Sequence, residues 1–300
     1  MSQILVSGLI NLEVTLRVER FPVDYFPVRY PFYGIGVTVS GVGFNVAKAL
    51  TRLGNQVTFL SLIGEEPVGE LARSTLRSEG ISDTLVLGRL AKTAQSVILY
   101  DDEGRRQINV DLKDVQQQAY PEELALPALE GCALAVLCNV NYSRPLLAMA
   151  QAAGVPVATD VHAIADLDDP YDRDFMAAAD VLFMSHERLP CAPEEWAQRV
   201  HGRYGTQVIV IGLGAEGALL HVVRDGLLER LPAPRTREVV STIGAGDALF
   251  AAFVDGYARG LPPRAALERA TLFASYKIGE AGAAEGLLDA EGLDRLVASQ

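Results

Sequence analysis

The sequence lacks the residue patterns on which several classes of protein depend. Only 3 of its 300 residues are cysteine, and no C-x-x-C pair occurs. An odd and scattered set of cysteines favours buried thiols in a reducing compartment over a disulfide framework. The 4 histidines show neither H-x-x-x-H nor H-E-x-x-H spacing, so we expect no histidine-built metal centre.

Long apolar runs and a basic leader are also missing. No stretch has the roughly 20 apolar residues that span a bilayer. Residues 4–6 (Ile-Leu-Val) begin an apolar run with no basic segment before it, so we expect no signal peptide. These two features predict a cytoplasmic protein without a membrane partner.

Positive charge is scarce, since 26 lysines and arginines face 38 acidic residues and the formal net charge is −12. No basic run offsets this excess, which argues against nucleic acid as a partner. Anionic ligands must then be held by backbone amides and helix dipoles. The patterns G-x-x-x-x-G-K-[ST] and G-x-S-x-G are absent, which excludes a P-loop enzyme and leaves a hydrolase triad without support.

The most informative stretch that is present is residues 241–247, S-T-I-G-A-G-D, which runs into an apolar helical pattern. Gly244 and Gly246 let backbone amides approach an anion, and the helix adds unpaired N–H groups and the positive end of its dipole. A carboxylate repels phosphate, so we interpret Asp247 as acting on a hydroxyl that attacks phosphorus. Near a helix N-terminus it should stay ionised and be a weak base. An N-capping acid on an ordinary helix remains the alternative.

Strands and helices alternate along most of the chain, which predicts an α/β fold with a mainly parallel sheet covered on both faces. Apolar runs indicate strands near residues 4–10, 57–63, 134–137, 155–159, 181–184 and 208–211, and helices near residues 45–53, 67–76, 145–153 and 194–204. Residues 12–38 and 94–111 interrupt the alternation, and residues 101–104 (D-D-E-G) indicate a hairpin. We expect one domain over residues 1–300, with the two insertions forming a small lid sheet.

Two further glycine-rich stretches stand out. Residues 40–45 (S-G-V-G-F-N) open a helix. Residues 212–217 match G-x-G-x-x-G after a strand, but the residues that follow, 218–223, are typical of another strand rather than the helix that a dinucleotide fingerprint requires. This turn either lines a mononucleotide pocket or is a plain tight turn.

Together, residues 40–45 and 242–247 resemble the two signatures of the ribokinase-like (PfkB) carbohydrate kinase family. The likeness covers nearly the whole chain, from Gly8-x-x-Asn11 to Gly282-Ala283. It implies a ribokinase-like three-layer α/β/α fold, and transfer of the γ-phosphoryl group of ATP, with Mg²⁺, to a hydroxymethyl group of a sugar. In that family the general base falls on Asp247 and the anion hole on the amides of Gly244, Ala245 and Gly246.

The same resemblance places the contacts to the acceptor on Asn11, Gly41 and Asn45. Where the family often has Asp two residues after Asn11, this chain has Glu13, and Asn141 stands where ribokinases have a glutamate. These departures argue against ribose as the acceptor more than they argue against kinase activity.

On the nucleotide side, the resemblance implicates Ser185, Gly212, Gly214, Gly217 and Thr271, together with Gly244 and Gly246. The family's N-x-x-E element is S-H-E-R at residues 185–188. Glu187 is therefore the candidate to meet Mg²⁺ through water, with a surface charge pair as the alternative. Ribokinases use an acid at the position of Ser241 for a monovalent cation, so we do not expect a potassium site.

Two alternatives to a sugar kinase stay open. A nucleoside kinase of the same family could stack a base on Phe26, Tyr30, Phe32 or Tyr33, although these aromatics could equally pack in the lid or form a dimer contact. The altered N-x-x-E element leaves room for a binding protein that has lost catalysis. By analogy with the family, we expect a homodimer that pairs through the lid.

Overall fold

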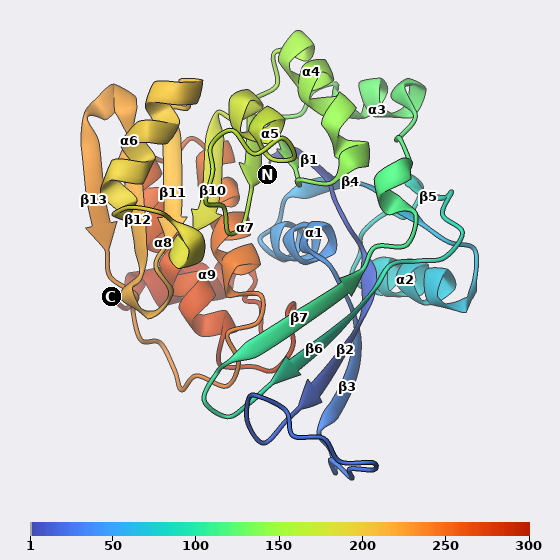
Figure 1. Cartoon of the computed structure of the whole chain (residues 1–300). Coiled ribbons are helices and arrows are strands. Elements are labelled where there is room, and N and C mark those ends of the chain that lie inside the picture. The colour runs from blue at the N-terminus through green and yellow to red at the C-terminus, as the bar shows by residue number, and fades with distance from the viewer. Residues whose placement is uncertain (1) are drawn as a thin grey trace.

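A computed structural model describes residues 2–300, whose strands form two sheets (Figure 1). The large sheet has the strand order β13-β12-β11-β10-β9-β8-β1-β4-β5. Its strands are β1 (Gln3–Ser7), β4 (Gln56–Ile63), β5 (Val86–Gly88), β8 (Leu134–Leu137), β9 (Val157–Asp160), β10 (Val181–Ser185), β11 (Val208–Gly212), β12 (Ala218–Val222) and β13 (Leu227–Leu231). All pairings from β5 to β11 are parallel, and β12 and β13 add an antiparallel edge. The mainly parallel sheet predicted from the sequence is confirmed.

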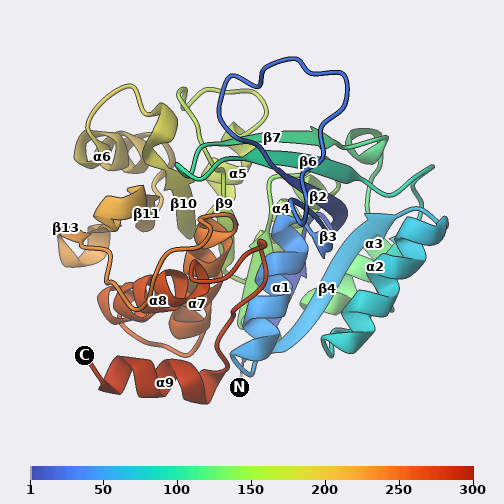
Figure 2. The ribbon, with the colours of Figure 1, turned by 90° about the horizontal axis from the view of Figure 1, so that it is seen from below.

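Helices cover both faces of this sheet (Figures 1 and 2). They are α1 (Val42–Arg52), α2 (Pro67–Ser78), α3 (Glu122–Leu129), α4 (Arg144–Ala153), α5 (Arg173–Ala178), α6 (Pro193–Tyr204), α7 (Ala245–Ala258), α8 (Pro263–Lys277) and α9 (Ala290–Ala298). One hydrophobic core joins the sheet to α1, α2, α7, α8 and α9, and a second core joins it to α3, α4, α5 and α6. The fold is therefore the three-layer α/β/α arrangement that was predicted.

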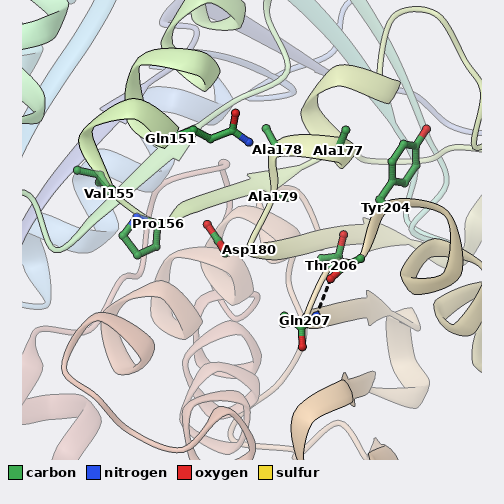
Figure 3. A pocket seen from close by; sticks show the side chains of 12 residues that line it. Gln151, Val155, Pro156, Ala177, Ala178, Ala179, Asp180, Tyr204, Thr206 and Gln207 are labelled. Carbon is green, nitrogen blue, oxygen red and sulfur yellow. Dashed lines mark hydrogen bonds between the residues drawn. The ribbon is translucent and has the colours of Figure 1, made fainter.

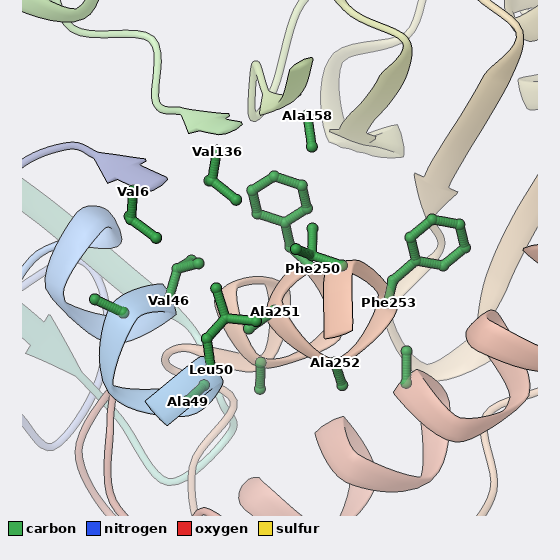
Figure 4. Packing of buried hydrophobic residues seen from close by; sticks show 14 of the residues in the cluster. Val6, Val46, Ala49, Leu50, Val136, Ala158, Phe250, Ala251, Ala252 and Phe253 are labelled. Atoms are coloured by element: carbon green, nitrogen blue, oxygen red, sulfur yellow. The ribbon is translucent and has the colours of Figure 1, made fainter. Parts of the chain in front are cut away.

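Helix α7, which follows the S-T-I-G-A-G-D stretch, lies deep in the first core (Figure 4). Phe250 and Phe253 are fully buried, and both rings contact Phe183 of β10, with centroids 4.9 and 5.2 Å apart. Burying aromatic rings of this size contributes a few kcal/mol each. This packing holds the start of α7 in a fixed place relative to the ends of the strands.

The small sheet is built from the two insertions, as predicted, and projects from the large one (Figure 1). Its strands are β2 (Asn11–Arg17), β3 (Ile35–Ser40), β6 (Gln95–Tyr100) and β7 (Arg106–Asp111), in the order β3-β2-β6-β7. A hairpin turn at residues 101–104 joins β6 to β7, with Gly104 at φ 81°. Residues 18–34 cross from β2 to β3 without helix or strand, and several of their aromatic side chains are exposed.

Some elements differ from the sequence predictions. The first strand ends at Ser7 instead of Ile10, and beyond it Leu9 O accepts a hydrogen bond from the Phe44 amide of α1 at 3.1 Å. Helices α3, α5, α8 and α9 were not predicted. In α8 the buried residues include Pro263, Thr271 and Lys277, so no single apolar stripe marks the helix in the sequence. Within residues 2–300, no helix combines the length and apolar character needed to cross a membrane.

The turn after β1 and the first turn of α1 meet through two glycines. A Cβ on Gly43 would lie 2.4 Å from the carbonyl carbon of Gly8, and a Cβ on Gly8 would lie 2.5 Å from Sγ of Cys138. Neither position can carry a side chain without moving backbone. This close approach brings the N-terminus of α1 against the ends of the central strands.

Replacing Gly43 by alanine tests this contact. In an ordinary helix the change stabilises by up to about 1 kcal/mol. Here the new methyl group collides with the Gly8 backbone, so we expect Gly43→Ala to lower the free energy of unfolding by roughly 1–3 kcal/mol. Gly202→Ala is the control, because a Cβ on this glycine of α6 meets no atom within 4 Å. Urea denaturation measures both variants, and equal stabilities would contradict the prediction.

Candidate active site

The loop at the start of α7 contains several backbone amides that have no hydrogen-bond acceptor within residues 2–300. Gly244 has φ 76°, and a Cβ there would lie 2.0 Å from the carbonyl oxygen of Ala283, so the position requires glycine. A Cβ on Gly246 would meet nothing within 4 Å, which leaves room for a ligand beside its amide. The Ala245 amide donates to Thr242 O at 3.2 Å. Among the described residues, no acceptor is bonded to the amides of Gly244, Gly246 or Asp247.

Asp247 lies in the first turn of α7 and is joined to the second glycine motif. Nδ2 of Asn45 in α1 donates to Oδ2 of Asp247 at 2.7 Å, and Asn45 also lies 3.4 Å from Oγ of Ser40. Burial raises the pKa of Asp247 to about 6, although the Asn45 bond lowers it in part. Asp247 is thus still mostly ionised at neutral pH, as expected, but its pKa is higher than a helix N-terminus alone would give. Desolvation outweighs the helix dipole, and Asp247 is a stronger base than its position in the sequence suggested.

Two oxygen atoms near this carboxylate are buried without a hydrogen-bond partner. They are Oδ1 of Asn11 and Oε1 of Glu13, both on β2. Nδ2 of Asn11 is held by Oγ of Ser96 at 2.8 Å, so its Oδ1 keeps a fixed direction. A Cβ on Gly41 would lie 2.9 Å from that Oδ1, so glycine keeps the space in front of it open. Burial raises the pKa of Glu13, and the charge of Asp247 adds to the effect.

Asn141 differs from the other residues assigned to the acceptor. It begins the short helix η2 (Asn141–Ser143), at the end of β8. Its Nδ2 donates to Gln116 O at 2.9 Å, and its Oδ1 accepts from Arg144 at 3.4 Å. The amide is thus engaged locally, whereas Asn11 and Glu13 keep free acceptors.

Four of the residues assigned to the nucleotide, Ser185, Gly212, Gly214 and Gly217, come together at the ends of β10 and β11. Ser185 pairs with Gly212 in the sheet, and Nδ1 of His186 lies 2.9 Å from Gly212 O. The turn beyond β11 contains η4 (Gly214–Glu216) and closes with Gly217 at φ 104°. Strand β12 follows, so the prediction that this G-x-G-x-x-G stretch leads into a strand is confirmed. A crevice at the carboxyl ends of parallel strands is where α/β sheets bind ligands.

Thr271 and Glu187, also assigned to the nucleotide side, show fewer features of a binding site. Thr271 is a buried residue of α8, and its hydroxyl donates to Glu268 O at 2.9 Å, so it presents no free donor. Glu187, in η3 (His186–Arg188), is exposed and lies 3.9 Å from Arg106. Residues 2–300 contain no group of three or more acidic, histidine or cysteine side chains able to hold a metal ion.

Several charged residues of the site were missed in the sequence. Arg106, on β7, donates to Oγ1 of Thr242 at 3.1 Å and so reaches from the small sheet to the loop before α7. Asp160 ends β9 and His162 follows two residues later, and both affect the pKa of Asp247 electrostatically. The only sequence signal that could have indicated His162 and Asp160 is their position at the end of a predicted strand. Arg106 follows the predicted hairpin at residues 101–104, but nothing in the sequence indicates what it contacts.

A separate cavity of about 380 Å³ lies at the amino ends of the parallel strands (Figure 3). It is bounded by the residues that precede β9, β10 and β11, among them Pro156, Asp180 and Gln207. The glycine loops and Asp247 lie at the carboxyl ends of the strands, so this cavity is not part of the candidate site.

Fold and site together define a phosphotransferase of the ribokinase-like class, and comparison with known proteins supports that reading. Residues 1–290 match the model of the pfkB family carbohydrate kinases. An ATP-dependent ribose-1-phosphate kinase of Halopiger xanaduensis is 28% identical over 294 residues, 94% of each chain. An acarbose 7(IV)-phosphotransferase of Actinoplanes sp. is 25% identical over 298 residues, 98% of each chain. The solved structure of the microbiome-derived acarbose kinase Mak1 superposes with a TM-score of 0.88 at 26% identity, covering 99% of both chains.

The chain belongs to the pfkB family of carbohydrate kinases, as its two motifs implied. Its class is that of the ATP-dependent sugar kinases. The family membership, the ribokinase-like fold and the kinase class predicted from the sequence are therefore confirmed.

Proposed function

We propose that this chain transfers the γ-phosphoryl group of ATP to a hydroxymethyl group of a small, uncharged sugar or sugar-like polyol. The observation that carries this proposal is the pair of buried, unpartnered oxygens on Asn11 and Glu13, close to the Asp247 carboxylate. Buried acceptors without partners are costly, and sugar hydroxyls are donors that would satisfy them. Asp247 then faces the hydroxyl that reacts.

Asp247 is the general base in this proposal. Its raised pKa of about 6 leaves it mostly ionised at neutral pH yet able to accept a proton. The Asn45 bond fixes one carboxylate oxygen, so the other is free for the acceptor hydroxyl. In a loose phosphoryl-transfer transition state the hydroxyl loses its proton late, so a base of this strength suffices.

The amides of Gly244 and Gly246 form the anion hole, with the Asp247 amide beside them. They have no hydrogen-bond acceptor among the described residues, so they would stabilise the transferring group without giving up a bond. The Ala245 amide, which the family resemblance adds to this set, must first release Thr242 O. The positive end of the α7 dipole adds to the same potential.

Ser185, Gly212, Gly214 and Gly217 are the residues that would line the nucleotide. Mg²⁺ would neutralise charge on the phosphates of ATP, and Glu187 is the carboxylate placed to hold it through water. A lone exposed carboxylate suits Mg²⁺, which keeps several waters and binds largely through substrate phosphates.

The small sheet would act as the lid of one catalytic domain spanning residues 1–300. Arg106 supports this role, because its contact with Thr242 already links β7 to the loop of the anion hole. Closure of such a lid would exclude water from the transferring phosphoryl group.

Asp247→Ala tests the base. We expect kcat to fall by roughly 10²–10⁴-fold, while a sugar acceptor still binds in calorimetry. In the wild type, kcat/KM should decline as the pH falls through about 6, since protonated Asp247 cannot accept a proton. Asn45→Ala should move this decline to higher pH, because it removes the bond that lowers the pKa of Asp247. Near-normal turnover of Asp247→Ala would refute the assignment.

The acceptor is the second test. Glu13 brings negative charge to the pocket, and no lysine or arginine is hydrogen-bonded to Asn11, Glu13 or Asn45 among the described residues. We therefore expect ADP release in a coupled assay with neutral sugars, and at least tenfold lower kcat/KM with sugar phosphates. Glu13→Gln should narrow that difference. A sugar phosphate as the best acceptor would contradict this expectation.

A nucleoside kinase is the second candidate function. The observation that favours it is the exposed aromatic segment at residues 25–33, where the rings of Tyr30 and Phe32 stack with centroids 6.5 Å apart. Adding nucleosides to the same assay separates the two, because nucleosides would then exceed every sugar in kcat/KM. ATP binding without ADP release for any acceptor would point to a binding protein that has lost catalysis.

We also propose a homodimer that pairs through the outer face of the lid. That face, opposite to the one that carries Glu13, exposes Ile35, Val37 and Val97, between 42% and 59% each. Clustered exposed apolar residues are typical of interaction surfaces. Sedimentation velocity should report a dimer for the wild type and a monomer for Val37→Lys, whereas a monomeric wild type would rule the dimer out.

A further inference from the structure

Lys277, the last residue of α8, is a fully buried lysine that no family motif identifies. Its ammonium donates to two backbone carbonyl oxygens, those of Ile243 and Gly282. Ile243 directly precedes the glycine loop of the anion hole. Gly282 belongs to the turn between α8 and α9, with φ 86°. The Lys277 side chain therefore links the loop before α7 to the turn after α8.

Burying this charge is expensive. Desolvation lowers the pKa of Lys277 to about 8, although Asp247, Glu13 and Glu285 favour the charged form and Arg237 opposes it. Within residues 2–300, no carboxylate is hydrogen-bonded to the ammonium. An apolar side chain of similar volume would avoid the desolvation penalty. Since a buried ammonium does not stabilise the fold, the role of Lys277 lies in what its charge contacts.

The bond to Ile243 acts directly on the anion hole. The carbonyl of Ile243 and the amide of Gly244 belong to the same planar trans peptide group, so its C=O and N–H point in opposite directions. The Lys277 ammonium, bonded to the Ile243 oxygen, therefore directs the Gly244 N–H away from Lys277 and polarises this N–H. That N–H has no acceptor among the described residues, and Gly244 is wedged against Ala283, next to Gly282.

We propose that Lys277 is a built-in cation that orients and polarises the Gly244 amide of the anion hole. It would do with a side chain what a monovalent ion does when carbonyl oxygens coordinate it. Neutral Ser241, two residues before Ile243, fits this arrangement, since no acid is present there to hold a free cation. The inference rests on the proposed anion-hole function of this loop and makes Lys277 a positioning residue.

The first experiment uses the wild-type protein. We expect ADP release to change less than twofold between choline chloride and 100 mM potassium chloride buffers. The ¹⁵N resonance of the Gly244 amide should titrate near pH 8, where Lys277 loses its proton. Strong activation by potassium, or a Gly244 resonance that does not move with pH, would overturn the proposal. Neither measurement depends on a variant that folds.

The second experiment compares Lys277→Met with Lys48→Met, because Lys48 is also buried but pairs with the carboxylates of Glu79 and Glu285. We expect Lys277→Met to lower kcat by roughly 10–10²-fold, with little change in the KM of the acceptor. It should also shift the Gly244 ¹⁵N resonance and abolish its titration. Lys48→Met should do neither, even if it lowers stability. An unchanged kcat in folded Lys277→Met would refute the role.

Asp247→Ala, measured in parallel, separates the two proposals. If that variant keeps its turnover, the assignment of the base fails, while the Gly244 resonance still reports on Lys277. If Asp247→Ala is inactive and Lys277→Met is fully active, the base stands and the built-in cation does not.

Discussion

The hydrogen bond between Asn45 and Asp247 joins two segments that lie 202 residues apart in the chain. Each residue sits in the first turn of a helix, and both helices pack on the same face of the large sheet. Their N-termini can meet only because Gly8 and Gly43 allow the backbone to approach closely on one side, and Gly244 allows it on the other. The candidate site depends on this convergence.

The protein has an excess of negative charge, yet its proposed reaction handles phosphate. The structure resolves this conflict locally. Free amides at the start of α7, the dipole of that helix, a buried ammonium behind the loop and Arg106 on β7 all raise the potential at one place. None of these needs a basic surface, so the net charge of −12 does not oppose binding of a nucleotide.

Burial and local hydrogen bonds add properties that the reading of single residues could not supply. Asp247 was expected to stay ionised as a weak base, and its buried surroundings raise its pKa and make it a stronger one. The Ala245 amide, expected in the anion hole, is bonded to Thr242 O, and the side chains of Asn141 and Thr271 are engaged in local hydrogen bonds. The pKa of Asp247 depends on neighbours that are distant in the sequence, and the hydrogen bonds of the other three residues are not specified by any motif.

The sequence by itself determined the family, the parallel α/β/α layers, the two insertions of the small sheet and the glycine loops around Asp247. These follow from local patterns, because apolar periodicity, turn glycines and helix starts act over a few neighbouring residues. Only the tertiary structure decided which acceptors stay unpaired, how strong a base Asp247 is, and that Arg106 and Lys277 reach the same loop. Those properties arise from desolvation and from contacts between residues more than 30 positions apart, such as Lys277 with Ile243.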